Sequence, residues 1–208
     1  GANTTRDLLL RWLALGVFTP LMRNHAALGT REQEPYQFEH IEDFRNVIGV
    51  RYRLVPYLYS EYMKAALHDG MYCMPLAFAF PEDDFARRVE DEVMIGESLL
   101  IAPVYEQNAR GRYVYLPEEM LQVRVKCSES NRIETSVLPA GHHYIPVELD
   151  EVVFFMRKGH LLPLAKDSKK IQSVADVDFA DLRLLAYAPD GASYEYLSLI
   201  HISEPTRH

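Results

Sequence analysis

Long hydrophobic runs, leader segments and basic stripes are all missing from this sequence of 208 residues. A membrane-spanning helix needs about 20 successive apolar residues, and no such run occurs. No charged-then-apolar leader opens the chain. Acidic and basic residues are interspersed at a net charge of −8, whereas nucleic-acid-binding proteins gather basic residues on one face. We therefore expect neither a membrane nor a nucleic acid as a partner.

Cysteine is scarce, and metal-binding patterns are absent. Cys73 and Cys127 form neither a CxxC pair nor a disulfide framework. We expect both thiols to be buried and reduced, as is typical of a cytoplasmic protein. The adjacent His142 and His143 point to opposite faces of an expected strand, so they cannot bind one metal ion together. There is no phosphate-binding loop and no GxSxG motif, and we expect no cofactor.

The two ends of the chain differ from those of a natural protein. Gly1 stands directly before a helical pattern, with no initiator methionine. Residues 197–208, LSLIHISEPTRH, do not continue the preceding pattern and resemble a translated sequencing adapter. Such segments are set aside in reasoning about the fold. We expect an internal fragment of a longer protein that ends at about Tyr196 and carries a non-native tail.

The chain begins with a pattern typical of a capped helix. In TTRDLLLRWLALG, Thr4 is the expected N-cap with Asp7 three residues later, and Gly16 suits the C-terminal end. The body is apolar nearly all round, which predicts that most of its surface is covered. The following VFTPLM predicts a short buried strand that is irregular at Pro20, because proline cannot donate to a sheet ladder.

A long helix is expected from Ile41 to about His68, where apolar residues recur at three- and four-residue steps. Pro56 lies inside it and should kink it or split it in two. Four tyrosines at helical spacing are more consistent with core packing, their hydroxyls reaching a neighbouring domain, than with a sugar-stacking platform: Tyr52, Tyr57, Tyr59 and Tyr62.

The pattern of the sequence changes near Tyr72, where short runs of branched and aromatic residues begin. Turn-forming residues separate these runs at a spacing of about 8–12 residues, which predicts an antiparallel sandwich. The expected strands lie in MPLAFAF, SLLIAPVY, GRYVYLP, LQVRVKC, HHYIPVEL, EVVFFMRKG, HLLPLA and, after a polar linker, LRLLAYAP. Helices followed by an all-β block predict a domain boundary near Tyr72.

A polar tip, Arg23-Asn24-His25, follows the first expected strand and precedes a long charged loop. If the segment belongs to a parallel β/α array, the tip lies at the carboxyl end of a strand, where barrel enzymes place functional side chains. These groups suit sugar hydroxyls or carboxylates. They would equally satisfy carbonyls and a buried acid such as Glu32 or Glu34. The length of the loop favours a functional role.

Acidic residues occur in clusters, but none suits glycosidic catalysis, which needs two carboxylates flanking one bond. All the clusters lie in or beside the β block between turn-like residues, so we expect them on a solvated surface. The clusters are Glu82-Asp83-Asp84, Glu90-Asp91-Glu92 and residues 148–151.

Six motifs in order resemble glycoside hydrolase family 31, and within it the α-glucosidases. They are RWLALGVFTPLMRNH, REQEPYQF, RYRLVPYLYSEY, IGESLLIAPV, GRYVYLP and EVVFFMRKGHLLPLA. The resemblance extends from Gly1 to about Tyr196. One departure follows Pro117, where EEMLQVRVK replaces the WYD-type run of many members. This departure leaves the substrate preference open.

The resemblance implies an α/β plus all-β fold: the last portion of a (β/α)8 TIM barrel followed by an antiparallel β-sandwich. Residues 1–72 would be the C-terminal part of the barrel and 73–167 the proximal sandwich. Residues 168–196 would begin a distal β domain, and 197–208 would be the adapter-like tail.

The resemblance also implies a retaining hydrolase for terminal α-linked glucose, with an oligosaccharide substrate. The nucleophile and acid/base aspartates of the family lie in earlier barrel segments, so we assign no catalytic residue here. The candidate substrate-binding residues are His25, which would bind hydroxyls of the sugar at the cleavage subsite, and Arg23, which would support the loop behind it. The oligomeric state is unknown.

Two alternatives stay open. A member of the same family acting on α-xylosides or α-galactosides would share these motifs. A non-catalytic carbohydrate-binding β-sandwich is disfavoured, because the expected strands show no exposed aromatic row and the single tryptophan, Trp12, lies in the first helix.

The first prediction concerns the 208 residues as an isolated chain. A partial barrel leaves open sheet edges and an uncovered apolar helix face, so we expect poor stability and no glycosidase activity. Unfolding curves and an assay with a chromogenic α-glucoside test this. Cooperative unfolding together with turnover would contradict it.

Overall fold

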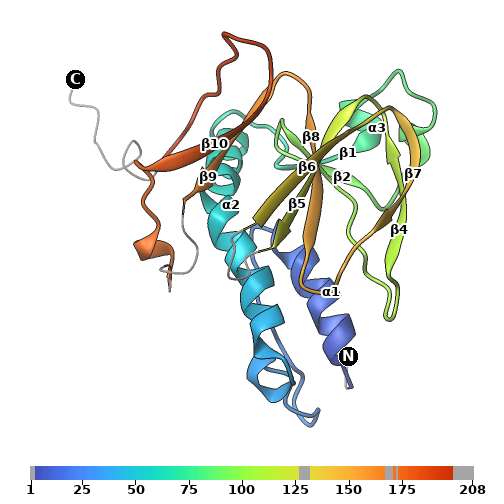
Figure 1. The fold of residues 1–208 in the computed structure, drawn as a ribbon, viewed down its shortest axis with the longest axis vertical. Coiled ribbons are helices and arrows are strands. Elements are labelled where there is room, and N and C mark those ends of the chain that lie inside the picture. The colour runs from blue at the N-terminus through green and yellow to red at the C-terminus, as the bar shows by residue number, and fades with distance from the viewer. Residues whose placement is uncertain (1–2, 127–131, 167–170, 172, 199–208) are drawn as a thin grey trace.

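Two helices followed by antiparallel strands make up the computed structural model, which describes residues 3–126, 132–166, 171 and 173–198 (Figure 1). Cys127 and residues 199–208 of the adapter-like tail lie outside this described part. The helices α1 (Arg6–Gly16) and α2 (Ile41–Leu67) lie side by side, and the loop between them runs down to the start of α2. From there α2 rises alongside the strands. No helix in the described ranges is long and apolar enough to cross a membrane.

Helix α1 is capped one residue later than expected. The N-cap is Thr5, not Thr4, and its side chain accepts from the Leu8 N–H at 3.3 Å. The helix includes Gly16, and Val17 is the C-cap. Most of the helix is covered, as expected: its residues are buried or half-buried except Trp12, which is 53% exposed.

The expected strand at 17–22 is absent; these residues form turns and bends. Val17 and Phe18 are nevertheless buried, and the Phe18 ring lies edge-on to Phe154 with centroids 5.9 Å apart. Pro20 has no N–H to donate, and side chains occupy the carbonyl groups that a strand would use. The segment is therefore buried by its side chains without belonging to a sheet.

Helix α2 is one continuous helix of 27 residues with Pro56 inside it, so the expected split does not occur. Pro56 removes one backbone donor, but Leu54, Val55 and Tyr57 around it are all buried, and their packing holds the two halves together. The helix ends as expected: Asp69 takes a left-handed φ of 53°, and the Gly70 N–H donates to the Ala65 carbonyl at 2.9 Å.

Six strands form the main sheet, and every neighbouring pair is antiparallel. In spatial order they are β1 (Cys73–Pro75), β2 (Val93–Ile95), β3 (Leu99–Ile101), β8 (Val152–Arg157), β5 (Met120–Lys126) and β6 (Arg132–Leu138). The sequence patterns miss β2, which is three residues long, and β6, which is mostly exposed and polar.

Two two-stranded antiparallel sheets, a short helix and single 3₁₀ turns complete the described fold. The two sheets are β4 (Gly111–Leu116) with β7 (Gly141–Pro146), and β9 (His160–Ala165) with β10 (Leu182–Tyr187). Expected strand MPLAFAF is a strand only at its start and then forms the short helix α3 (Leu76–Ala79). Three 3₁₀ turns are η1 (Pro35–Gln37), η2 (Ala86–Arg88) and η3 (Val174–Asp176).

The six-stranded sheet is covered on both faces. Along β8 the side chains alternate: Phe154 and Met156 join the core formed by the helices, while Phe155 joins a second core with Val114 and Ile145 of the β4–β7 pair. The sandwich prediction is confirmed, with β4 and β7 as the second layer. The opposite face of the same sheet is closed by α1 and α2.

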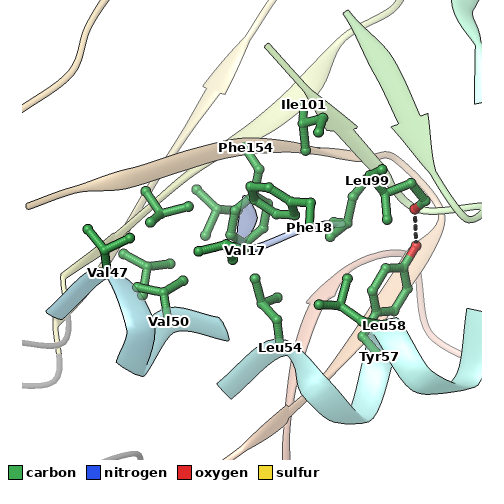
Figure 2. Close-up of a cluster of buried hydrophobic side chains, with 14 of the residues drawn as sticks. Val17, Phe18, Val47, Val50, Leu54, Tyr57, Leu58, Leu99, Ile101 and Phe154 are labelled. Atoms are coloured by element: carbon green, nitrogen blue, oxygen red, sulfur yellow. Dashed lines mark hydrogen bonds between the residues drawn. The ribbon is translucent and has the colours of Figure 1, made fainter. Parts of the chain in front are cut away.

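One of the four tyrosines on α2 carries the expected core role. Tyr57 is fully buried among apolar side chains, as Figure 2 shows, and its hydroxyl donates to the Ile95 carbonyl at 2.7 Å. The same oxygen accepts from the Ser98 N–H at 3.0 Å, so the hydroxyl reaches the β2–β3 turn. Tyr62, in contrast, is 47% exposed.

A second side chain of α2, Glu61, reaches the same turn. Its carboxylate is 3% exposed and accepts from the Glu97 N–H at 2.9 Å and from the Tyr194 hydroxyl at 2.6 Å. Lys64 Nζ lies 3.0 Å away and balances its charge. Glu61 therefore joins the long helix, the sheet and the last described segment at one point.

Cys73 corrects an expectation about the thiols. It is free and exposed in the described structure, because it begins the edge strand β1 instead of a central strand. The prediction for Cys127 falls on a residue outside the described ranges.

The second prediction tests the Glu61 contact. Gly96 has a φ of +61°, and an added Cβ would lie 2.2 Å from Glu61 Oε2. The carboxylate can yield only by giving up buried hydrogen bonds, so Gly96→Ala should lower the free energy of unfolding by about 3 kcal/mol or more. Urea unfolding measures this.

Gly191→Ala is the matched control, because Gly191 also has a positive φ, +85°, with nothing within 4 Å of an added Cβ. It carries the backbone strain alone, about 1–2 kcal/mol. Equal losses in the two variants would show that the Glu61 contact contributes nothing measurable.

Candidate functional site

The tip, Arg23–His25, is exposed, and two of its side chains contact each other. Arg23 Nη2 lies 2.9 Å from His25 Nδ1. A guanidinium can only donate, so Nδ1 must be the acceptor, and the proton of a neutral imidazole is then on Nε2. The contact thus leaves His25 with a free N–H donor on the side of the ring away from Arg23.

The third side chain of the tip ties it to the following loop. Asn24 Nδ2 donates to the carbonyl of Gln33, which is 5% exposed, at 2.7 Å. The alternative expectation paired Arg23 or His25 with Glu32 or Glu34. Within the described ranges Glu32 instead accepts from Gln37 at 2.9 Å, and Glu34 Oε2 has no hydrogen-bond partner.

Behind the tip, each backbone carbonyl from Gly16 to Leu21 lies within hydrogen-bond distance of a side chain; we call these six groups the carbonyl row. Arg51 Nη1 lies 3.2, 2.7 and 2.8 Å from the oxygens of Gly16, Val17 and Thr19, and Nη2 lies 3.3 Å from that of Pro20. These donors replace the neighbouring strand that a sheet would supply.

Two further hydroxyls complete the carbonyl row. The Tyr72 hydroxyl donates to the Phe18 carbonyl at 2.7 Å. The Thr19 hydroxyl lies 2.9 Å from the Gly16 oxygen and 3.0 Å from the Leu21 oxygen. Burial raises the pKa of the Tyr72 hydroxyl, so this group keeps its proton and remains a donor near neutral pH. Burial lowers the pKa of the Arg51 guanidinium, but the ordinary pKa of arginine lies so far above neutral that Arg51 still donates.

The loop after the tip is fastened to the start of α1. Arg31 donates to the Thr4 carbonyl and lies over the Phe38 ring, 5.5 Å from its centroid. Arg6 Nε donates to the Glu39 carbonyl at 3.0 Å. These contacts hold a loop with little regular structure of its own, and they leave the tip open to solvent.

Two hollows meet at the tip. One, of about 520 Å³, is lined by all three tip residues together with Trp12 and Gln33. The other, of about 680 Å³, is lined by Arg23 and Asn24 and by three rings of α2: the half-buried Tyr52 and Tyr59 and the exposed Tyr62. In the described part of the chain no aspartate or glutamate lines either hollow.

The acid clusters lie in the β region, and two of their members correct the expectation of a solvated surface. Glu151 is 5% exposed and binds Arg124 at 2.8 Å. Glu92 is 6% exposed and accepts from the Tyr115 N–H at 2.8 Å, while its Oε2 has no partner in the described ranges. Glu92 is thus held by the backbone of β4, and Glu151 by the guanidinium of Arg124.

The histidine pair behaves as two separate side chains. His142 packs against the rings of Phe85 and Tyr115, and His143 Nε2 lies 2.8 Å from the Pro139 carbonyl. Within the described residues no group of three or more histidine, cysteine or acidic side chains could hold a metal ion.

An exposed aromatic pair contradicts the expectation that the strands of the sandwich show no exposed aromatic residues in a row. Tyr113 and Tyr144 face each other across β4 and β7, with ring centroids 5.3 Å apart, and they are 72% and 53% exposed. The strand patterns contain both rings, but which strands pair cannot be read from one sequence, and so the pair was missed.

Two family models match the chain. The glycosyl hydrolases family 31 TIM-barrel domain matches residues 1–61, and the glycosyl hydrolase family 31 C-terminal domain matches residues 70–162. The chain belongs to glycosyl hydrolase family 31. The membership covers both the helical portion that carries the tip and the sandwich.

Relatives in family 31 include several α-glucosidases. Alpha-glucosidase 2 of Bacillus thermoamyloliquefaciens is 28% identical over 205 residues, which cover 93% of this chain and 25% of that protein. Human neutral alpha-glucosidase C is 30% identical and bovine lysosomal alpha-glucosidase 33%, over 94% and 78% of this chain and 22% and 18% of theirs. The chain thus spans about a quarter or less of the length of these relatives.

Solved structures share the fold. A cycloalternan-forming enzyme from Listeria monocytogenes superposes with a TM-score of 0.76 at 22% identity, covering 94% of this chain and 19% of that one. The α-xylosidase of Xanthomonas citri superposes with a TM-score of 0.64 at 25% identity, covering 83% and 18%. The fold prediction, the end of a TIM barrel followed by a β-sandwich, is confirmed for this family 31 chain.

The third prediction concerns the pKa of the buried Glu92. Burial raises the pKa of Glu92 to about 7, so its protonated form is favoured in the folded state. The stability that this form contributes is complete below pH 4.5, the ordinary pKa of the group, and is lost as the pH rises through 7. Relative to Glu92→Gln, the wild type should lose about 3 kcal/mol of unfolding free energy across that window.

Melting temperatures of both proteins between pH 5 and pH 8 measure the difference. Glu90→Gln is the control, because Glu90 is exposed and should leave the pH dependence unchanged. Parallel pH profiles for the wild type and Glu92→Gln would show that Glu92 ionises as an ordinary carboxyl group.

Proposed function

We propose that this chain is part of a retaining α-glucosidase that releases terminal α-linked glucose from the non-reducing ends of oligosaccharides. The observation that carries the proposal is the exposed Nε2–H of His25, which Arg23 orients by binding Nδ1 at 2.9 Å. A neutral donor held in one orientation, in the lining of a hollow that also contains Arg23, Asn24 and Gln33, suits a sugar hydroxyl, which accepts without carrying a charge.

His25 would act by binding, without taking part in proton transfer to the leaving group. Its hydrogen bond to a hydroxyl of the sugar tightens as the ring flattens towards the oxocarbenium-like transition state, so it lowers the barrier more than it strengthens ground-state binding. Arg23 would hold the imidazole in the Nε2–H form. The nucleophile and the acid/base aspartates would lie in the barrel segments that the relatives possess beyond the span of this chain.

The choice of glucose as the sugar rests on the relatives. Two relatives that match more than nine-tenths of the chain by sequence are named α-glucosidases. Of the solved structures with the same fold, one is a cycloalternan-forming enzyme and another is an α-xylosidase. A panel of chromogenic α-glucoside, α-xyloside and α-galactoside substrates separates these activities. The family matches extend over helices and sandwich together, which counts against a free-standing carbohydrate-binding module.

We also propose a cytoplasmic location, on the ground that the chain carries only two cysteines and no disulfide framework. The bovine relative is by name lysosomal, so the compartment differs within the family. Fractionation of the source cells tests this proposal.

The fourth prediction tests His25 in the complete enzyme. His25→Ala should lower kcat/KM for a chromogenic α-glucoside by about 100-fold or more, which is the usual cost of removing one transition-state donor. His25→Gln keeps a side-chain N–H and should lose less. His143→Ala, in β7 of the sandwich, is the matched control and should keep wild-type activity.

Melting temperatures of the three variants separate a binding defect from a folding defect. An unchanged rate for His25→Ala would remove His25 from the site. An unmutated enzyme that cleaves none of the three glycosides would contradict the proposed function itself.

A further inference from the structure

We propose that Arg51 is the positioning residue of the sugar-binding tip: its guanidinium holds the carbonyl row, and through it the placement of His25. The inference rests on the proposed function, because positioning matters only if His25 binds substrate. Its structural part, that Arg51 sets the conformation of residues 17–25, stands on the contacts alone.

The segment that leads to the tip has almost no backbone support of its own. No backbone–backbone hydrogen bond within the described ranges involves residues 20–25. The segment is also not in a strand, so no sheet neighbour fixes it. Side chains instead form a scaffold that supplies partners for the carbonyl row. Its carbonyls at the buried Val17 and Phe18 would otherwise cost free energy comparable to a lost hydrogen bond, and those of the exposed Pro20 and Leu21 are bound in the same way.

Arg51 supplies most of this scaffold. It reaches four of the six oxygens of the carbonyl row, at 2.7–3.3 Å, while Tyr72 and Thr19 reach the others. Within the described residues, the hydrogen bonds of Arg51 go to backbone carbonyls and none to a carboxylate. The positive charge of the guanidinium is thus balanced by the negative ends of four carbonyl dipoles, and its attraction holds these four carbonyl groups close to one another.

The planar fork of arginine is needed for this arrangement. Five N–H groups in a rigid plane can serve several oxygens at once, whereas a lysine ammonium is a compact point charge with three donors. The row ends at Leu21, two residues before Arg23, which itself holds the His25 ring. A shift of the row therefore moves the Arg23–His25 pair as one unit.

The chain also offers a matched control on the same helix. Arg45 lies six residues earlier on α2, pairs with Glu42, and has a side chain that is 68% exposed. Arg45→Met removes the same charge and keeps the same alkyl stem length as Arg51→Met, but it touches no part of the carbonyl row.

The test compares Arg51→Met, Arg51→Lys and Arg45→Met in the complete enzyme, each with His25 intact and with His25→Ala. With His25 intact, Arg51→Met should lower kcat/KM for the chromogenic glycoside 10- to 100-fold, mostly in kcat, and Arg51→Lys should restore part of it. In the His25→Ala background, Arg51→Met should change the rate by less than threefold. Arg45→Met should match the wild type in both backgrounds.

A second readout does not depend on catalysis. Trypsin cleavage after Arg23 should become faster in Arg51→Met and stay unchanged in Arg45→Met, at a temperature where both remain folded. Equal loss of activity in the two His25 backgrounds would overturn the positioning role. Unchanged cleavage would overturn the scaffold role, and this arm decides even if the unmutated enzyme proves to have no glycosidase activity.

Discussion

Helix α2 holds the molecule together because its side chains make polar contacts with three other parts of the chain. Tyr57 and Glu61 reach the β2–β3 turn of the sheet, and Glu61 also binds Tyr194 near the end of the described chain. Six residues before Tyr57, Arg51 holds the segment that leads to His25. The sandwich and the Arg23–His25 tip are thus both attached to α2, which sets their relative positions.

These contacts are polar, and their position inside an apolar core gives them their strength. Tyr57 is fully buried, and Glu61 is nearly so, with every described contact of its carboxylate made to a donor. In such surroundings a hydrogen bond is expensive to lose, because no water replaces the missing partner. Apolar packing along α2 supplies the bulk of the attraction, and the polar contacts select one register of helix against sheet.

Much of the fold was predictable from local patterns. The long helix, its end at Asp69-Gly70 and most strands were evident from periodicity and turn residues, and Pro56 did not interrupt the helix because buried neighbours outweigh one lost hydrogen bond. The failures have a common cause. The segment at 17–22 has the composition of a strand, but strand formation depends on a neighbouring strand, and the donors at this point are Arg51 and Tyr72, far away in the sequence.

The site was predictable in part. The Arg23-Asn24-His25 motif pointed to the tip, and the structure brings Arg23 and His25 together there. Arg51 gave no signal, because an arginine on an amphipathic helix is usually a solvated side chain. Glu92 was missed for a related reason: an acid in a charged turn is expected to face water, and only the path of β4 encloses it.

The coverage of the six-stranded sheet on both faces has a further implication. Phe154 and Met156 face the helices, while Phe155 of the same strand faces the β4–β7 layer. If the chain were divided near Tyr72, the strands would lose the helices that cover one face of the sheet, and the apolar side chains of that face would be exposed to water. Helices α1 and α2 lie before Tyr72 and the strands after it, but both contribute side chains to one hydrophobic core and would have to fold together.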